Sequence, residues 1–227
     1  MQATCEETNR IEAFRNINPE SIQAICSIAK KKQLKKGEVL FLEKDRINKF
    51  YAVLEGKVSM SRYSEKGQKR VFFILGEGCL VNEVVFDDLP VSVVCEAFEP
   101  CLILEFAKND FLKIMEKDFK LTMNILNSIG KKQRRLYRQL KNTMPIRMDK
   151  RLAAKLWKLS KDHGKLSDGW HKIDLEMSIT YLSYMLGSNR ETISRAMKVL
   201  ADLDLVRWVD KKMYVDEKGL LAYYRKE

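Results

Sequence analysis

The sequence predicts an α+β chain with an N-terminal β-barrel, a long helix and a C-terminal winged helix-turn-helix. Between residues 32 and 106, short apolar runs alternate with turns that contain glycine, a pattern typical of a barrel or sandwich. Residues 109–142 contain no proline and carry a heptad repeat, and the α-rich remainder holds two short helical patterns separated by a glycine-containing turn. We therefore place the domain boundaries at 1–108, 109–144 and 145–227.

The composition indicates a globular protein with a polyanionic partner. Of the 227 residues, 45% are apolar and 32% are charged, and the formal net charge is +11. A positive surplus favours binding to nucleic acid or to an anionic membrane surface. No apolar run approaches the roughly 18 residues of a transmembrane helix, and the N-terminus lacks the pattern of a signal peptide. We expect a cytoplasmic protein without membrane attachment, whose five scattered cysteines (positions 5, 26, 79, 95 and 101) are free thiols.

The predicted barrel strands follow from apolar runs and from the turns between them. Gly37 precedes the first run, Glu55-Gly56 separates two more, and a turn at Lys66-Gly67 leads into another. The last two strands are hinged near Glu99-Pro100. We interpret the basic run at 30–36, where the barrel begins, as a solvated turn. The predicted strands lie at 38–41, within 49–63, at 71–75 and within 91–106.

The long helix is predicted to begin at a cap formed by Asn109 or Asp110 and to end before Pro145. Its stripe recurs every three or four residues and favours a coiled-coil partner, the alternative being a helix that lies on the core of its own domain. The basic run at 130–141 is interpreted as exposed charge, with Lys132 as a possible exception that lines an effector cavity. The stripe consists of Met115, Phe119, Thr122, Leu126, Ile129, Gln133, Leu136 and Leu140.

The C-terminal part is predicted to fold as a helix over 147–164, a helix-turn-helix and a strand–turn–strand wing over 206–216. Gly187 permits a left-handed turn, and Ser188 or Asn189 can cap the helix that follows. The expected buried positions alternate with helical spacing. They are Leu182, Met185 and Leu186 in the first helix and Ile193, Met197 and Leu200 in the second.

This pattern leaves Arg190, Glu191, Ser194 and Arg195 on the outer side of the second helix, near its start. The N-terminal residues of a recognition helix read base edges in the major groove of double-stranded DNA. Arginine can bind guanine O6 and N7, and glutamate can accept from cytosine N4. Glu191 and Arg195 can also pair with each other because they are four residues apart. Further candidates for DNA contact are Ser188, Asn189, Thr192, Thr180 and the wing residues Lys211 and Lys212.

At this point the sequence resembles the CRP/FNR superfamily of bacterial transcription regulators. In the C-terminal part, the resemblance rests on GSNRETISR (187–195) and VLADLDLV (199–206). In the N-terminal part, four runs are similar to the family's cyclic-nucleotide-binding β-barrel, which is a jelly roll. They are KKGEVLF, FYAVLEGKVSM, LGEGCLVNE and VSVVCEAFEPCLILEF. It covers essentially the whole chain. It implies a homodimer joined by the long helix, an inverted-repeat DNA site, and RNA polymerase as a further partner if the protein is an activator.

The resemblance also suggests the DNA half-site. Arg190, Glu191 and Arg195 match the base-reading residues of the cyclic-AMP receptor branch, and Ser194 matches a serine that the oxygen-sensor branch uses. Since both sets are present, half-sites of TGTGA type and of TTGA type are both open. The resemblance further implies that an effector repositions the two recognition helices through a hinge near residues 143–147.

The sensor domain is not expected to bind cyclic AMP or cyclic GMP. Cyclic-nucleotide binders of this family hold the phosphate with a Gly-Glu pair and an Arg-Ser or Arg-Thr pair. Here Asn82 stands in place of the glycine and Val91 in place of the arginine, while Glu83 and Ser92 are kept. A buried phosphate needs a charge-assisted partner, which valine does not supply. Leu136 and Tyr137 also replace the Thr-Ser pair expected to meet the base.

Two effector alternatives remain open. One is an uncharged or weakly acidic small molecule between barrel and helix, near Asn82, Glu83, Val91, Ser92, Lys132, Leu136 and Tyr137. The other is no ligand, with activity set by abundance or by oxidation of Cys79, Cys95 or Cys101.

Cofactors and catalysis are not expected. Cys5 and Cys26 lie too far apart for an iron-sulfur cluster, and haem is disfavoured because both histidines, His163 and His171, lie in the C-terminal part. Cysteines on barrel strands are more often small buried hydrophobes than ligands. We find no glycine-rich phosphate loop, no metal-ligand spacing and no nucleophile–base set, so an enzyme is not predicted. The alternative to a DNA-binding regulator is a cyclic-nucleotide-type module that acts on a partner protein.

Overall fold

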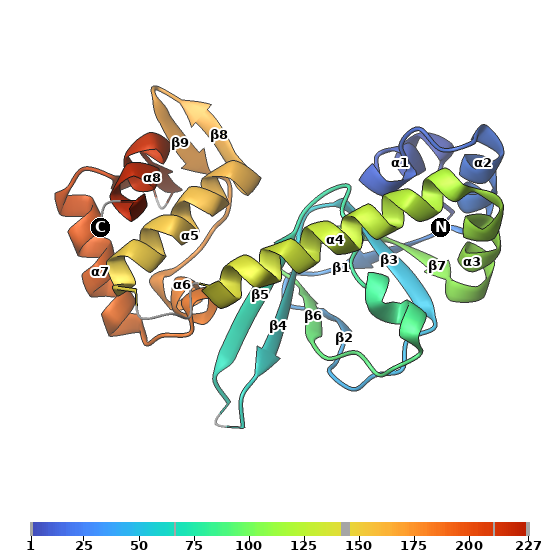
Figure 1. The fold of residues 1–227 in the computed structure, drawn as a ribbon, viewed down its shortest axis with the longest axis horizontal. Coiled ribbons are helices and arrows are strands. Elements are labelled where there is room, and N and C mark those ends of the chain that lie inside the picture. The colour runs from blue at the N-terminus through green and yellow to red at the C-terminus, as the bar shows by residue number, and fades with distance from the viewer. Residues whose placement is uncertain (1, 66, 142–145, 211, 226–227) are drawn as a thin grey trace. The chain divides into compact units, whose positions relative to one another are not determined.

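The computed structural model describes residues 2–65, 67–141, 146–210 and 212–225 (Figure 1). The chain forms two compact units, Met1–Ser64 with Val71–Tyr137 and Glu65–Arg70 with Arg138–Glu227. The predicted α+β class is confirmed: the first unit contains a β-barrel and most of a long helix, and the second contains a helix-turn-helix with a wing. The predicted end of the long helix at Pro145 and most of the predicted hinge lie outside the described residues.

The barrel consists of two antiparallel sheets around an apolar interior. One sheet has the order β1 (Lys30–Leu34), β7 (Cys101–Ala107), β3 (Lys49–Glu55), and the other β2 (Val39–Phe41), β6 (Val94–Ala97), β4 (Val58–Tyr63), β5 (Lys69–Leu75). Their inner faces supply a buried cluster that includes Val53, Val58 and Ile103. The strands predicted from apolar runs and glycine turns are therefore confirmed.

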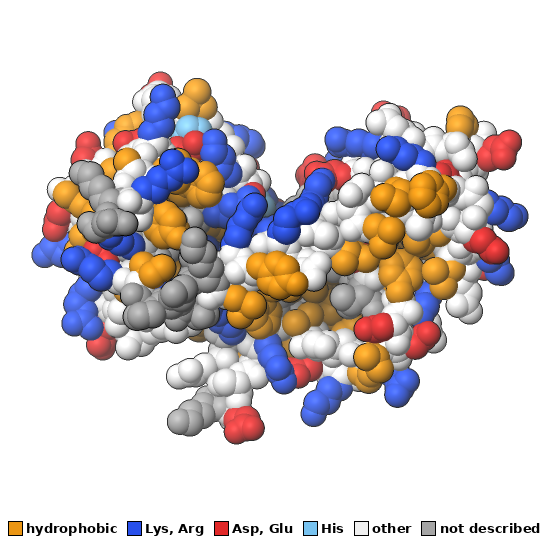
Figure 2. Space-filling model, viewed as in Figure 1, with side chains coloured by type: hydrophobic (Ala, Val, Ile, Leu, Met, Phe, Trp, Pro, Cys, Tyr) orange, Lys and Arg blue, Asp and Glu red, His pale blue; other side chains and the backbone are white. Residues whose placement is uncertain are grey.

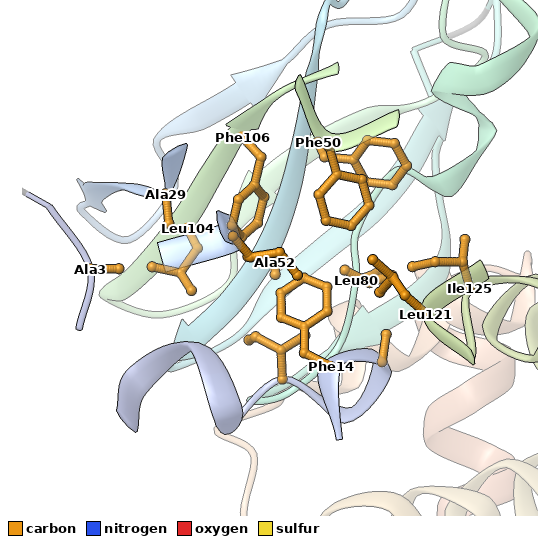
Figure 3. Close-up of a cluster of buried hydrophobic side chains, with 14 of the residues drawn as sticks. Ala3, Phe14, Ala29, Phe50, Ala52, Leu80, Leu104, Phe106, Leu121 and Ile125 are labelled. Carbon is orange, nitrogen blue, oxygen red and sulfur yellow. The ribbon is translucent and has the colours of Figure 1, made fainter. Parts of the chain in front are cut away.

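Helices cover the outer face of the β1–β7–β3 sheet. These are α1 (Cys5–Asn9), η1 (Glu12–Phe14), α2 (Pro19–Ile28), α3 (Lys108–Lys117) and the first part of α4 (Phe119–Lys141). A second buried cluster fills the space between them and the sheet, with four phenylalanines at its centre (Figure 3). Leu121 and Ile125 of α4 are fully buried in it. One face of α4 therefore packs on the core of its own unit.

The predicted single helix from residue 109 is wrong, because the chain breaks at Asp118 between α3 and α4. The buried Asp118 carboxylate accepts hydrogen bonds from Leu121 N (3.0 Å), which caps α4, and from Asn18 N (2.9 Å). Met115 consequently lies on α3, on a different helix from the other members of the stripe, and packs against the phenylalanine cluster. Neither predicted cap is used at the other end, because α3 begins at Lys108 after Ala107, without a side-chain cap.

Two further expectations about the N-terminal unit are wrong. Residues 30–34, interpreted as a solvated turn, form β1, an edge strand that tolerates charge because one side of it faces water. Lys31 pairs with Glu7 of α1 at 2.7 Å. Cys5 and Cys26 were expected as free thiols, but they form a disulfide that joins α1 to α2. The Cα atoms of the two cysteines lie 5.4 Å apart.

The other three cysteines, Cys79, Cys95 and Cys101, are free. Burial raises the pKa of Cys95 to about 12 and that of Cys101 to about 11, and it also raises the pKa of Cys79. Since the thiolate is the reactive form of cysteine, these environments oppose oxidation near neutral pH.

The C-terminal unit packs three helices and a further terminal helix on a small sheet. Its elements are α5 (Met148–His163), β8 (Gly164–Ser167), β9 (Trp170–Ile173), α6 (Ile179–Leu186), α7 (Arg190–Asp202), β10 (Val206–Val209), β11 (Lys212–Val215) and α8 (Glu217–Arg225). The sheet has the order β10–β11–β9–β8. Tyr223 of α8 donates to the buried Asp149 of α5 at 2.5 Å, and Arg147 pairs with the same carboxylate at 2.8 Å.

Candidate nucleic-acid interface and sensor site

The helix-turn-helix is built by two caps and one glycine. Ser178 Oγ accepts from Tyr181 N at 3.1 Å and begins α6. Gly187, at φ +60°, ends α6 in the left-handed conformation that glycine adopts without a steric penalty. Asn189 Oδ1 then accepts from Thr192 N at 2.8 Å and begins α7. The predicted turn is confirmed, and of the two predicted caps Asn189 is the one used.

The second helix presents an apolar inner face and a polar outer face. Ile193, Met197 and Leu200 are buried, as predicted, and Ala196 is buried with them. Arg190, Glu191, Ser194 and Arg195 are exposed, Asn189 is exposed, and Ser188, Thr192 and Thr180 are half-buried.

No ion pair joins Glu191 to Arg195 in the part of the chain that the structure describes. The internal pairing that their spacing allows is therefore not made, and both groups face solvent. Sequence reasoning missed Lys198, which is exposed one turn beyond Arg195 and lies on the same helical face.

The wing carries a concentration of positive charge. Lys212 begins β11 and is exposed, while Lys211 lies outside the described residues. Lys172 on the neighbouring strand β9 lies so close that Lys212 lowers the pKa of Lys172. Like charges held side by side repel, so this arrangement favours a nearby anion. Lys172 was not a sequence candidate because β9 was not predicted.

The sensor site is centred on Glu83, at the start of the short helix η2 (Glu83–Asp87). Glu83 is buried, with 3% of its side chain exposed, and it pairs with Lys132 of α4. Its other carboxylate oxygen accepts from Ser128 Oγ at 2.6 Å. Lys132 also donates to the carbonyl oxygens of Leu80 (2.8 Å) and Val81 (3.2 Å). Ser128 was missed by sequence reasoning, although it lies four residues before Lys132 and so on the same helical face.

The remaining predicted pocket residues divide into two groups. Asn82 is buried, with Oδ1 accepting from Tyr51 N (2.9 Å) and Nδ2 donating to Lys49 O (2.8 Å). Val91 is buried in the apolar interior of the barrel. Ser92, Leu136 and Tyr137 are exposed to solvent. The structure therefore pairs buried Glu83 with half-buried Lys132, bonds the neighbouring Asn82 to β3, and leaves Ser92 and Tyr137 exposed.

A second face of α4 is apolar and exposed. Leu126 is 52% exposed and Leu136 is 40% exposed, whereas Leu121 and Ile125 on the adjacent face are fully buried. Figure 2 shows hydrophobic side chains following the course of α4. Ile129 is half-buried because it also touches the core cluster. The exposed apolar members of the predicted stripe are Phe119, Leu126, Leu136 and Leu140.

Within the described residues, no helix combines the length and apolarity needed to cross a membrane. The same part of the chain holds no group of three or more His, Cys, Asp or Glu side chains arranged around a metal site.

Two family models match the chain. One is described as a cyclic nucleotide-binding domain and matches residues 31–118, and the other is described as a Crp-like helix-turn-helix domain and matches residues 150–223. The chain is 19% identical over 214 residues to a CRP-like cAMP-activated global transcriptional regulator of Mycobacterium tuberculosis. The aligned region covers 94% of this chain and 96% of that protein. It is 26% identical over 209 residues to the cyclic AMP receptor protein of Thermus thermophilus, with 92% and 94% covered.

The fold is similar to solved structures as well. A transcriptional regulator of the CRP/FNR family from Thermus thermophilus superposes with a TM-score of 0.69 at 21% identity, covering 87% of this chain and 99% of that one. The two family models match in the order in which the barrel and the helix-turn-helix occur along the chain. The chain therefore belongs to the CRP/FNR family of DNA-binding transcription regulators, with an N-terminal sensor domain and a C-terminal Crp-like helix-turn-helix.

Proposed function

We propose that the protein acts as a homodimer that binds an inverted-repeat DNA site with half-sites of TGTGA or TTGA type. In this proposal residues 1–108 sense, 109–144 dimerise and 145–227 bind DNA. The observation that carries it is α7, where Arg190, Glu191, Ser194 and Arg195 are exposed in the first two turns of a helix whose inner face is buried and apolar. A helix anchored in this way can enter the major groove with its first turns against the bases.

The exposed groups suit the chemistry of base reading. Arg190 and Arg195 can each bind guanine O6 and N7, and Glu191 can accept from cytosine N4 because no ion pair with another described residue occupies its carboxylate. Phosphate contacts position the helix without reading sequence. For these we propose the half-buried or exposed Thr180, Ser188, Asn189 and Thr192, together with the wing lysines Lys211 and Lys212 and the adjacent Lys172 of β9.

The exposed stripe of α4 supports the homodimer. Four large apolar side chains follow one face of a 23-residue helix and are open to water in the single chain. Heptad spacing is the pattern with which two helices pack side by side. Two symmetric copies of such a chain place two recognition helices on successive turns of DNA, so that the operator is an inverted repeat.

We further propose that the protein does not bind cyclic AMP, although two relatives are named for that ligand. Two observations support this: Val91 is buried and has no charge to pair with a phosphate, and the neutral amide of Asn82 is held by Tyr51 N and Lys49 O. Within the described residues, no observation favours the alternative of a module that acts on a partner protein.

The test is in vitro selection of DNA from a random pool with the full-length protein, followed by fluorescence anisotropy on the enriched site. Arg190→Ala should weaken specific binding by about 1–3 kcal/mol and relax the preference at one base pair. Arg15→Ala, an equal loss of charge at an exposed position of the N-terminal unit, is the matched control and should bind as the wild type does. If Arg190→Ala keeps full specificity, α7 is not the reading helix.

A further inference from the structure

A half-buried lysine on α4 makes as many polar contacts as its ammonium group has N–H donors. Lys132 Nζ donates to Leu80 O and Val81 O at 2.8 Å and 3.2 Å and pairs with Glu83. An ammonium has three N–H donors, and here each has an acceptor. The Lys132 side chain is 18% exposed and that of Glu83 is 3% exposed, so the pair is largely withdrawn from water.

The carboxylate of Glu83 is held by two successive turns of the same helix. One oxygen pairs with Lys132 and the other accepts from Ser128 Oγ at 2.6 Å. Side chains four residues apart lie on the same helical face, so both grip the carboxylate from one side. Since Leu80, Val81 and Glu83 belong to the barrel unit and its adjoining turn, these bonds fasten the middle of α4 to the barrel.

The polar side chains around this place are already bonded to the chain itself. Asn82 uses its oxygen on Tyr51 N and its nitrogen on Lys49 O, and Val91 is apolar. A ligand that bound Glu83 would leave the Lys132 ammonium without its carboxylate partner at a site that is largely withdrawn from water. Breaking a buried pair by removing one partner is strongly unfavourable, so an exchangeable ligand competes poorly here.

We propose that Lys132 serves as a resident cation that fixes α4 to the barrel in place of a diffusible effector, so that the protein binds its operator without any ligand. A ligand controls a regulator because it binds one of the protein's two conformations more tightly than the other. Here the corresponding bonds are made by the chain itself and are always present. This inference rests on the proposed DNA-binding function and assigns Lys132 as a positioning residue of it.

The experiment measures operator binding by anisotropy with the full-length protein, first shown by mass spectrometry of a denatured sample to carry no co-purified small molecule. The wild type should bind its selected site with no ligand, and 1 mM cyclic AMP or cyclic GMP should change the Kd by less than about twofold. Lys132→Met should weaken specific binding by about tenfold or more, with the dimer and the circular dichroism spectrum unchanged. Lys132→Arg, which keeps the charge, should restore part of the loss.

The neighbouring Lys131→Met is the matched control. Lys131 is 70% exposed and its nearest carboxylate, on Glu12, is 4.0 Å away, so this variant should bind as the wild type does. If Lys132→Met does not fold, Ser128→Ala decides instead, because it removes one hydroxyl bond and leaves the ion pair. It should weaken binding about two- to fivefold, and an unchanged Kd overturns the proposal.

The outcomes separate this inference from the proposed function. Selection that enriches no DNA sequence under any condition refutes DNA reading itself. Operator binding that requires an added small molecule, or full binding by folded Lys132→Met, leaves DNA reading intact and overturns the resident cation.

Discussion

Asp118→Ala should destabilise the N-terminal unit more than the removal of any exposed carboxylate would. The buried Asp118 caps α4 through Leu121 N and also accepts from Asn18 N, at the start of α2. Loss of an N-cap costs about 1 kcal/mol. A buried N–H left without an acceptor costs about 1–3 kcal/mol more. The free energy of unfolding should therefore fall by about 2–4 kcal/mol.

Urea unfolding followed by two probes can locate this loss. The three tryptophans, Trp157, Trp170 and Trp208, all lie in the C-terminal unit, so their fluorescence reports that unit alone. Far-ultraviolet circular dichroism reports both units. With a slope of about 1–3 kcal/mol per molar urea, the dichroism midpoint should fall by about 1 M or more, while the fluorescence midpoint should move much less.

The same carboxylate predicts a dependence on pH. Burial of Asp118 favours the neutral acid, but the N–H groups of Leu121 and Asn18 favour the carboxylate more, and the pKa of Asp118 is lowered. The stabilisation is therefore present above the ordinary carboxyl pKa of about 3.9 and is lost as pH falls through the lower folded value. The gap between wild type and Asp118→Ala should stay constant from pH 7 to about pH 4 and shrink below it.

Asp110→Ala on α3 is the matched control. Asp110 is exposed and pairs with Lys113 at 3.2 Å, a surface contact worth about 0–1 kcal/mol. If Asp118→Ala unfolds within about 0.5 kcal/mol of this control, the junction between α3 and α4 is not held as described.

Two further predictions concern the dimer and the thiols. Leu136→Glu should raise the dimer dissociation constant by about tenfold or more, because burying one leucine contributes about 1.5–3 kcal/mol. Light scattering across a dilution series measures this constant, and Arg134→Glu on the opposite face of α4 is the control. A Leu136→Glu dimer as stable as the wild type would refute the stripe as the dimer contact. Cys95 should resist iodoacetamide in the native protein at pH 8, because burial raises its pKa to about 12 and leaves almost no thiolate; mass spectrometry checks this, and alkylation as fast as in urea would contradict it.

The sequence predicted the elements whose signals are local. Apolar runs bounded by glycine turns located β2 to β7, and Gly187 with Asn189 located the helix-turn-helix, because each depends on residues within a few positions. The break at Asp118 was missed because one of its partners, Asn18, lies 100 residues away along the chain. The Cys5–Cys26 disulfide was missed for a related reason, since two short helices had to be placed before the sulfurs could be paired.

The β8–β9 hairpin is absent from the predicted elements although its turn carries a local sequence signal. The hairpin of β8 and β9 turns on Asp168-Gly169, both with positive φ (49° and 78°). Asp-Gly is a strong signal for a two-residue hairpin turn. The flanking strands are short and polar, which concealed the period-two pattern, and Lys172 went unnoticed with them.

The sensor site was predicted in its composition but not in its bonding. The loss of arginine at Val91 was readable, and Glu83 and Lys132 were both named as pocket residues. Their mutual pairing was not, because it depends on the rotation of α4 about its axis relative to the barrel. Leu121 and Ile125, buried against the phenylalanine cluster, set that rotation.

The angular phase of α4 consequently limits how this helix can change in length. One residue inserted after Ile125 would rotate the rest of α4 by about 100° about the helix axis. Lys132 would then no longer face Glu83, and the apolar stripe would point in a different direction. Seven inserted residues would return the rotation to within about 20° but would shift Lys132 along the axis by about 10 Å. The stretch between Ile125 and Lys132 therefore tolerates no insertion or deletion, whereas whole heptads can be added beyond Arg135, whose guanidinium lies 5.1 Å from the centre of the Phe73 ring, without moving these contacts.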